Sequence, residues 1–220
     1  MIEHAAKPEW VDAERWLTTT VVKPGPEHER ALRSAVERGM PAIEVQPTAG
    51  KLLSLLVRIS GARRVLEVGT LAGYSSVWMA QALPDGGHLD TLEYLPEHAE
   101  VARENFAAAG LTERVTVHVG AALTTLPRLE GPYDLVFIDA DKQNDAAYLE
   151  WAVRLGRPGT VVVLDNAVWE GIMLDPRRDE ENGPGIVEAL ELLGGPLFDA
   201  TVIQTAGSKG WDGFALAVVK

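Results

Sequence analysis

Short apolar runs alternate with helical stretches over most of the chain after residue 63. Five runs read as strands: Arg64–Val68, His88–Glu93, Val115–Val119, Tyr133–Ile138 and Thr160–Leu164. Helical patterns separate them, the clearest being Pro96–Ala109, which is followed by Gly110. Apolar strands that alternate with helices predict a parallel sheet covered on both faces.

The two ends of the chain carry different patterns. Pro26–Gly39 begins with proline and acid and ends at glycine, and Thr48–Ser60 repeats leucines at helical spacing, so both predict helices. The last helical pattern is Pro184–Leu193. Two strand-like runs follow it, Asp199–Gln204 and Gly213–Val219, and they are close enough to form an antiparallel pair across a turn.

These patterns predict one domain over residues 1–220, with a helical N-terminal segment at 1–60 and an α/β core at 61–220. The core is expected to be a doubly wound, Rossmann-like sheet of five parallel strands plus a C-terminal antiparallel hairpin, with helices on both faces. In such a sheet, ligands bind beyond the carboxyl ends of the strands.

Composition narrows the classes of function. The chain has 32 acidic and 20 basic residues and a formal net charge of −12, which disfavours nucleic acid as a partner. It has no cysteine, which excludes thiolate metal ligands and thiol nucleophiles. The N-terminus lacks a signal-peptide pattern, and no apolar run approaches the roughly 20 residues that span a bilayer. We therefore expect a cytoplasmic protein that does not enter the membrane.

The first predicted strand runs into a glycine turn. Gly69 and Gly73 let the backbone approach a ligand closely. Leu71 stands where the dinucleotide pattern G-x-G-x-x-G requires its central glycine, which disfavours a pyrophosphate ligand. Glu67, just before the turn, either orders the loop or meets the ammonium group of an amino-acid-like ligand. The alternative is an ordinary strand–turn–helix junction.

The second predicted strand ends at another acid, Glu93. An acid at this place can accept hydrogen bonds from both ribose hydroxyls of a nucleoside. The alternative is a solvated acid at a strand end. Glu67 and Glu93 together, both at the predicted ligand edge, favour a ligand that carries a nucleoside.

Strands four and five also end in acids, Asp139 within DADK and Asp165 followed by Asn166. Because these strands are sequential, we expect them to be neighbours and their acids to emerge at one edge. Two adjacent carboxylates raise each other's pKa unless a cation neutralises them. A set of oxygen ligands selects a hard ion, Mg²⁺ first and then Mn²⁺ or Ca²⁺. The alternative is that the acids cap the helices that follow.

In combination, these motifs resemble the small cation-dependent, class I S-adenosylmethionine O-methyltransferases, the group that includes catechol and caffeoyl-CoA O-methyltransferases and their bacterial relatives. The matching stretches are LEVGTLAGYSS (66–76), GAAL (120–123), FIDADKQN (137–144) and RPGTVVVLDNAVWEG (157–171). The resemblance extends from about Glu44 to Val219. It implies methylation of a hydroxyl of a catechol-like or caffeoyl-like small aromatic molecule with a divalent metal, and a homodimer.

The resemblance also implies roles for individual residues. Those placed around S-adenosylmethionine are Val45, Glu67, Gly69, Thr70, Ser75, Glu93, Ala122 and Asp139. The implied metal ligands are Asp139, Asp165 and Asn166, and Trp169 would flank the aromatic substrate.

Lys142 matches the catalytic base of the catechol enzyme, and it can take a proton only if its pKa falls from about 10.4. Its alternative role is a surface cation paired with Asp141 or Asp145. Asp145 itself departs from the family pattern, which often has tyrosine there. Trp211 and Asp212 are expected on a loop near the substrate, although packing or a dimer contact is the alternative for the tryptophan.

Three other functions remain open at this point. A nicotinamide-dependent oxidoreductase would use a similar sheet, but the missing central glycine and the Asp/Asp/Asn set argue against it. A cofactor-binding protein without catalysis is disfavoured by Lys142. Methylation of an amine or of a non-catechol hydroxyl is compatible with the same motifs.

Overall fold

The computed structural model describes residues 6–220, so the first five residues of the predicted helical segment 1–60 lie outside the described part. The chain divides into two compact units, which are considered separately: Trp16–Leu129, and Glu130–Lys220 with the described residues before Trp16. The chain starts with helix α1 (Pro8–Leu17) and a short π-helical segment, η1 (Thr18–Val22). Among residues 6–220, no helix is long and apolar enough to cross a membrane.

The unit Trp16–Leu129 contains three parallel strands in the order β3 (Val115–Val119), β2 (His88–Glu93), β1 (Arg64–Val68). Their bounds are those that the sequence predicts. The last four residues of β1 are all buried, which explains its nearly continuous apolar run, since a strand covered on both faces needs no polar side.

Three helices of this unit are predicted by the sequence: α2 (Pro26–Glu37), α3 (Pro47–Ser60) and α5 (Pro96–Ala108). The unit also contains α4 (Tyr74–Ala82), the short α6 (Ala122–Thr125) and η2 (Leu126–Arg128). Proline occupies the first position of α2, α3 and α5, where the missing N–H costs no hydrogen bond. Helix α3 ends at Gly61, whose φ of 67° is the left-handed conformation of a glycine cap.

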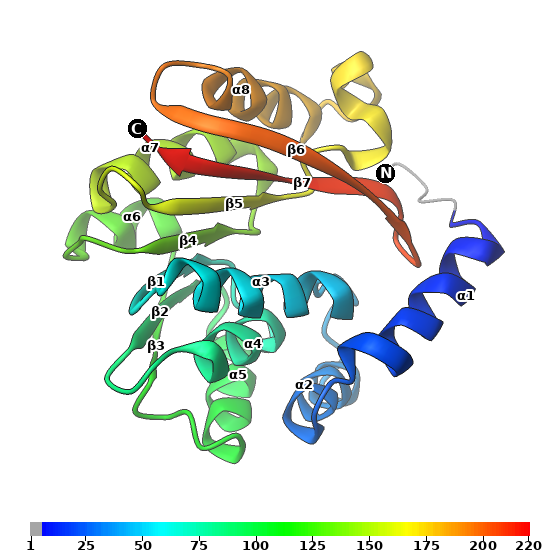
Figure 1. Cartoon of the computed structure of the whole chain (residues 1–220), viewed down its shortest axis with the longest axis vertical. Coiled ribbons are helices and arrows are strands. Elements are labelled where there is room, and N and C mark those ends of the chain that lie inside the picture. The colour runs from blue at the N-terminus through cyan, green and yellow to red at the C-terminus, as the bar shows by residue number, and fades with distance from the viewer. Residues whose placement is uncertain (1–5) are drawn as a thin grey trace. The chain divides into compact units, whose positions relative to one another are not determined.

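The other unit contains the strand order β4 (Leu135–Ile138), β5 (Val161–Asp165), β7 (Gly210–Val219), β6 (Phe198–Gly207). Strands β4 and β5 are parallel, and β7 is antiparallel to both β5 and β6 (Figure 1). Its helical segments are η3 (Lys142–Asn144), α7 (Asp145–Leu155), η4 (Trp169–Leu174), η5 (Pro176–Arg178) and α8 (Gly183–Leu193). The predicted β4–β5 pairing and the antiparallel C-terminal pair are confirmed.

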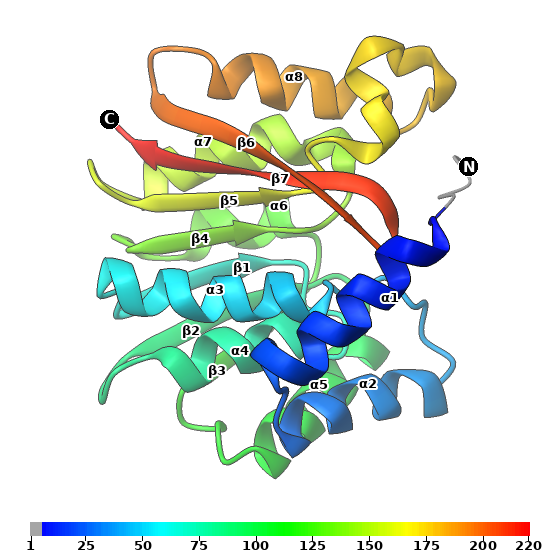
Figure 2. The same ribbon diagram turned by 45° about the vertical axis from the view of Figure 1, so that its right-hand side comes forward.

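The C-terminal hairpin is longer than the sequence predicts (Figure 2). Pairing continues from Gln204 opposite Gly213 to Gly207 opposite Gly210, so only two residues remain in the loop. Gly210 adopts a φ of 87°, a conformation that glycine tolerates. The predicted turn over residues 205–212 is therefore mostly strand, and Trp211 and Asp212 lie in β7 rather than on a loop.

Candidate active site

The glycine turn between β1 and α4 requires its glycines. Gly69 and Gly73 have φ values of 102° and 82°, and a Cβ on Gly73 would lie 2.5 Å from the ring of Phe106. Leu71 also has a positive φ, 51°, which is unfavourable for a leucine. Its N–H donates to Oε2 of Glu93 at 2.8 Å. An acid at the end of β2 thus helps to hold the turn in its conformation.

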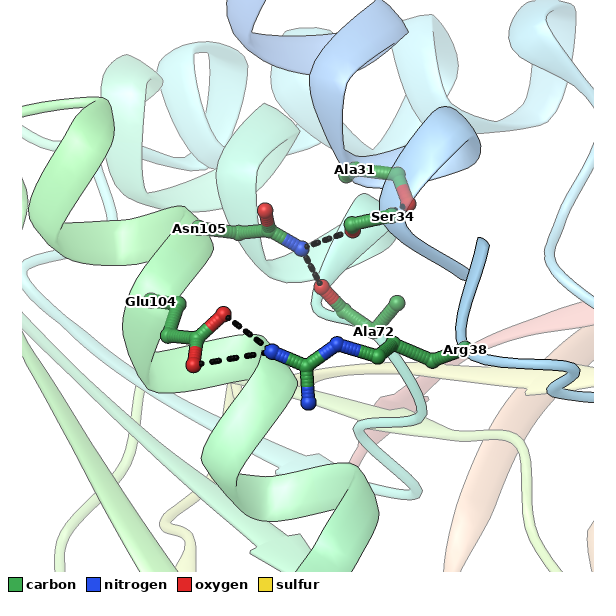
Figure 3. A network of polar contacts seen from close by, with 6 residues as sticks. All are labelled: Ala31, Ser34, Arg38, Ala72, Glu104 and Asn105. Atoms are coloured by element: carbon green, nitrogen blue, oxygen red, sulfur yellow. Dashed lines mark hydrogen bonds and ion pairs between the residues drawn. The ribbon is translucent and has the colours of Figure 1, made fainter. Parts of the chain in front are cut away.

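A second set of contacts ties the turn to α2 and α5 (Figure 3). The Asn105 side chain in α5 donates to the carbonyl of Ala72 in the turn at 2.9 Å and to the Ser34 hydroxyl in α2 at 2.7 Å. Arg38 at the end of α2 forms an ion pair with Glu104 of α5 at 3.0 Å. The N-terminal helix α2 is therefore connected to the backbone of the glycine turn.

Glu67 is fully buried, and its carboxylate accepts hydrogen bonds from three hydroxyls. The donors are Ser75 and Ser76 in the first turn of α4, and Thr91 in β2 at 2.7 Å. Three donors offset the cost of removing a carboxylate from water. Of the two roles that the sequence leaves open for Glu67, these contacts are those of loop ordering. A contact with the ammonium group of a ligand stays a prediction.

Glu93 is buried at the carboxyl end of β2. Besides Leu71, it accepts a hydrogen bond from the N–H of Leu95 at 2.9 Å, and Nδ1 of His98 lies 3.7 Å from the same oxygen, Oε1. A carboxylate offers about four acceptor positions, so these contacts leave capacity for ribose hydroxyls. Its position is consistent with the predicted role.

The remaining predicted cofactor residues of this unit lie close to the ends of β1 and β3 or before α3. Val45 is buried just before α3, and Ala122 is the first residue of α6, soon after β3. The Thr70 hydroxyl lies 2.6 Å from that of Thr91. Their contacts with a cofactor stay predictions.

In the other unit, Asp139 and Asp165 occupy neighbouring strand ends. Ile138 and Leu164 are partners in the β4–β5 register, and each acid is the next residue along its strand. Burial and the charge of Asp139 raise the pKa of Asp165. The sequence therefore places these two carboxylates correctly at one edge.

Lys142 lies beside this pair and is only 5% exposed. Its Nζ donates to Oδ1 of Asp139 at 3.1 Å. Burial lowers the pKa of Lys142, but the charges of Asp139, Asp145 and Asp165 raise it more, so the net shift is upward. The expected fall of this pKa depends on a nearby cation and stays a prediction, while the three carboxylates around the ammonium group act in the opposite direction.

The alternative of a surface cation paired with Asp141 is wrong, since Lys142 is buried. Asp141 instead accepts hydrogen bonds from the Asn144 amide and from the Tyr148 hydroxyl, the latter at 2.6 Å. These contacts join the end of β4 to η3 and α7. They hold the segment that carries Lys142.

Asp145 is 1% exposed, and its Oδ1 has no hydrogen-bond partner in the described part of the chain. Burial raises its pKa to about 7, against the opposing charge of Lys142. The sequence marks Asp145 as a departure from the family pattern and as a possible partner of Lys142. In the structure it is one of the carboxylates that act electrostatically on Lys142.

Asn166 and Trp169 lie in the segment after β5, and both are anchored to Asp212 of β7. The Asn166 amide donates to Oδ2 of Asp212 at 2.7 Å, and the Trp169 N–H donates to Oδ1 at 2.8 Å. The sequence misses this role of Asp212, because the contact joins residues that only the pairing of β5 with β7 brings together.

Comparisons with known proteins identify the family of the chain. The sequence profile described as O-methyltransferase matches residues 26–192, most of the chain. The chain belongs to the O-methyltransferase family. A catechol O-methyltransferase of Mycobacterium tuberculosis is 48% identical over 211 residues, which cover 95% of this chain and 96% of that protein. The predicted class of enzyme, an S-adenosylmethionine-dependent O-methyltransferase, is thereby confirmed.

Solved structures of O-methyltransferases have the same fold. One from Bacillus cereus, in complex with SAH, is 44% identical with a TM-score of 0.93 and covers 96% of this chain and 99% of its own. One from Streptomyces achromogenes, involved in tomaymycin synthesis and in complex with SAM, is 41% identical with a TM-score of 0.93 and covers 100% of both chains. These likenesses confirm the predicted doubly wound, Rossmann-like methyltransferase fold.

Proposed function

We propose that this O-methyltransferase moves the methyl group of S-adenosylmethionine to a hydroxyl of a catechol-like or caffeoyl-like small molecule, with a divalent cation bound at Asp139, Asp165 and Asn166. The observation that carries the proposal is the pair of carboxylates on adjacent strand ends, with the buried amine of Lys142 at 3.1 Å from one of them. The catechol O-methyltransferase that is 48% identical to the chain supports the choice of acceptor.

The residues of this cluster fit a hard cation. Asp139 and Asp165 repel each other, which contributes to the raised pKa of Asp165, and a positive ion between them would remove that cost. Two carboxylates and the amide oxygen of Asn166 form a set of oxygen ligands, for which Mg²⁺ is the first choice. In residues 6–220, no group of three or more His, Cys, Asp or Glu side chains is arranged for a metal. The third ligand that we propose is the amide oxygen of Asn166.

A divalent cation held by Asp139, Asp165 and Asn166 would supply positive charge that lowers the pKa of an acceptor hydroxyl and offsets the carboxylates that keep Lys142 protonated. Lys142, once its ammonium group has released a proton to solvent, would take the hydroxyl proton on its neutral Nζ, which lies beside Asp139. The hydroxyl oxygen bonds to the methyl carbon while the carbon–sulfur bond breaks. The sulfur keeps the electron pair, so neutral S-adenosylhomocysteine leaves.

The glycine turn and Glu93 are the proposed cofactor site. Glu93 would accept hydrogen bonds from the ribose hydroxyls while its bond to the Leu71 N–H keeps the turn in place. Trp169, whose backbone is anchored to Asp212, would flank the aromatic ring of the acceptor. The homodimer is a further expectation that follows from the resemblance, and the cytoplasmic location is one that follows from the sequence pattern.

A mass-spectrometric screen tests the acceptor class. The protein is incubated with S-adenosylmethionine and with catechols, caffeoyl esters, hydroxylated flavonoids, monophenols and aromatic amines, each with and without EDTA. We expect a mass gain of one methyl group only for acceptors with adjacent hydroxyls, and only without EDTA. Methylation of monophenols or amines that EDTA leaves unchanged would overturn both the acceptor and the metal.

A further inference from the structure

The segment after β5 has an unfavourable backbone. Asn166, Trp169 and Glu170 have φ values of 59°, 40° and 53°, in a region that side chains other than glycine rarely occupy. Residues persist in such conformations only where the surrounding structure holds them there. The segment follows Asp165 directly, so its conformation decides where the Asn166 side chain lies.

Two carboxylates hold this segment against β7. Oδ1 of Asp212 accepts hydrogen bonds from the backbone N–H groups of Trp169 and Gly213, each at 2.8 Å, and Oδ2 accepts from the Asn166 amide at 2.7 Å. In the reverse direction, Glu170 of the segment accepts from the N–H of Trp211 at 2.8 Å. The segment therefore donates hydrogen bonds to Asp212 of the strand, and it accepts one from the strand through Glu170.

The contact with Asp212 also determines the orientation of the Asn166 side-chain amide, that is, whether its oxygen or its NH₂ group faces Asp212. The oxygen and nitrogen of an asparagine side chain are nearly identical in shape, so only hydrogen bonding distinguishes the two orientations. A carboxylate oxygen accepts and does not donate, so the NH₂ group of Asn166 must face Asp212. Its Oδ1 then lies on the other side of the amide, as the atom that a cation can use.

We propose that Asp212 is a positioning residue that turns the Oδ1 of Asn166 toward the divalent cation. The proposal rests on the metal site of the proposed function, and it adds a residue of β7 that would act on the cation through Asn166. Residues that orient metal ligands through a hydrogen bond commonly change metal affinity about 10- to 100-fold when they are replaced. Asp212 has the geometry for that role.

The Asp212→Asn variant tests the proposal with little change of shape. If the new oxygen accepts from the N–H groups of Trp169 and Gly213, the new NH₂ group faces the NH₂ group of Asn166. The Asn166 amide must then flip and present its nitrogen to the cation. We expect the affinity for Mn²⁺, titrated by calorimetry or electron paramagnetic resonance, to fall about 10- to 100-fold.

Two further variants separate positioning from a general loss of charge. Asp199→Asn removes one carboxylate from the exposed part of β6 and is expected to leave Mn²⁺ affinity unchanged. In the double variant Asp212→Asn with Asn166→Asp, the new carboxylate accepts from the new amide and offers its other oxygen to the cation. We expect the double variant to recover most of the affinity that Asp212→Asn loses.

Hydrogen exchange provides a readout that needs no metal. In the wild type, the Trp169 amide should exchange slowly because Asp212 accepts its hydrogen bond. Wild-type Mn²⁺ affinity in Asp212→Asn, or no recovery in the double variant, would overturn the positioning role. A wild-type protein that binds no Mn²⁺ would instead contradict the proposed function, and fast exchange at Trp169 in that wild type would overturn the role of Asp212 as well.

Discussion

Nζ of Lys142 lies 3.1 Å from Oδ1 of Asp139, and only 5% of the lysine is exposed. The amine is therefore already in place beside a proposed metal ligand. Three carboxylates favour its protonated form. Offsetting their charge is what would turn Lys142 from an ion-pair partner into a base.

Replacing Lys142 should reduce turnover without disturbing the cofactor. In Lys142→Met, which keeps the length of the side chain, we expect turnover to fall by about 10²- to 10⁴-fold, the usual contribution of a general base. Turnover of Lys142→Arg should fall by a similar factor, because a guanidinium does not deprotonate in proteins. Steady-state kinetics and calorimetric titration with S-adenosylmethionine measure the two effects, and wild-type turnover in Lys142→Arg would contradict the role as base.

Asp145 should make the protein less stable as the pH rises. Its pKa is raised to about 7 in the folded protein from 3.8, so the folded state keeps a proton that the unfolded state releases. Stability contributed by this group falls between about pH 4 and pH 7 and stays low above that range. Asp145→Asn should therefore raise the free energy of unfolding at pH 8 by on the order of 3 kcal/mol, and much less at pH 5. Denaturant unfolding at both pH values measures this, and an equal gain at both would refute it.

His28 should make the protein less stable as the pH falls, which is the opposite dependence to that of Asp145. Burial lowers its pKa below 6.5, and its Nδ1 accepts a hydrogen bond from the Gly25 N–H at 3.1 Å. The unfolded state therefore takes up a proton first, and stability is lost as the pH falls below about 6.5. In His28→Phe, the fall of the melting temperature between pH 6.5 and pH 5 should be smaller than in the wild type. An identical pH dependence in the two proteins would argue against this role.

Replacing Asn105 should reduce stability and cofactor binding more than breaking the ion pair between Arg38 and Glu104, although both contacts connect α2 to α5 (Figure 3). Asn105→Ala removes the buried hydrogen bond that Asn105 donates to the Ala72 carbonyl. We expect this loss to lower the free energy of unfolding by about 1–3 kcal/mol. It should also weaken binding of S-adenosylmethionine, because Ala72 belongs to the glycine turn.

Arg38→Ala is the matched control for Asn105→Ala, since its ion pair with Glu104 is exposed and contributes at most about 1 kcal/mol. Chemical unfolding and calorimetric titration of the two variants measure the difference. Equal losses in stability and cofactor affinity would show that the buried amide has no special connection to the turn.

Structural features that depend on residues close together along the chain could be predicted from the sequence. The bounds of β1, β2 and β3 follow from their apolar runs, although only β1 is buried along nearly its whole length and β3 is mostly half-buried or exposed. The hairpin is different, because Gly207, Gly210 and Asp212 have the composition of a turn but pair as strand residues. Strand pairing is decided by tertiary contacts, which local composition does not record.

The candidate site likewise has features that the sequence predicts and features that it does not. Asp139 and Asp165 could be placed together because sequential parallel strands end at one edge. The raised pKa of Lys142 could not be predicted, since it depends on the charge of Asp145 as well as on those of Asp139 and Asp165. The contact between Asn166 and Asp212 joins residues 46 positions apart, and no spacing rule indicates it.

The most direct test of the central claim measures methyl transfer to catechol from S-adenosylmethionine that carries a labelled methyl group. We compare the wild type with added Mg²⁺, the wild type with EDTA, and Asp165→Ala with Mg²⁺, and we confirm cofactor binding in each. The account predicts label on a catechol hydroxyl in the first case only, with cofactor binding in all three. Equal transfer with EDTA or in Asp165→Ala, while the cofactor is bound, would contradict it.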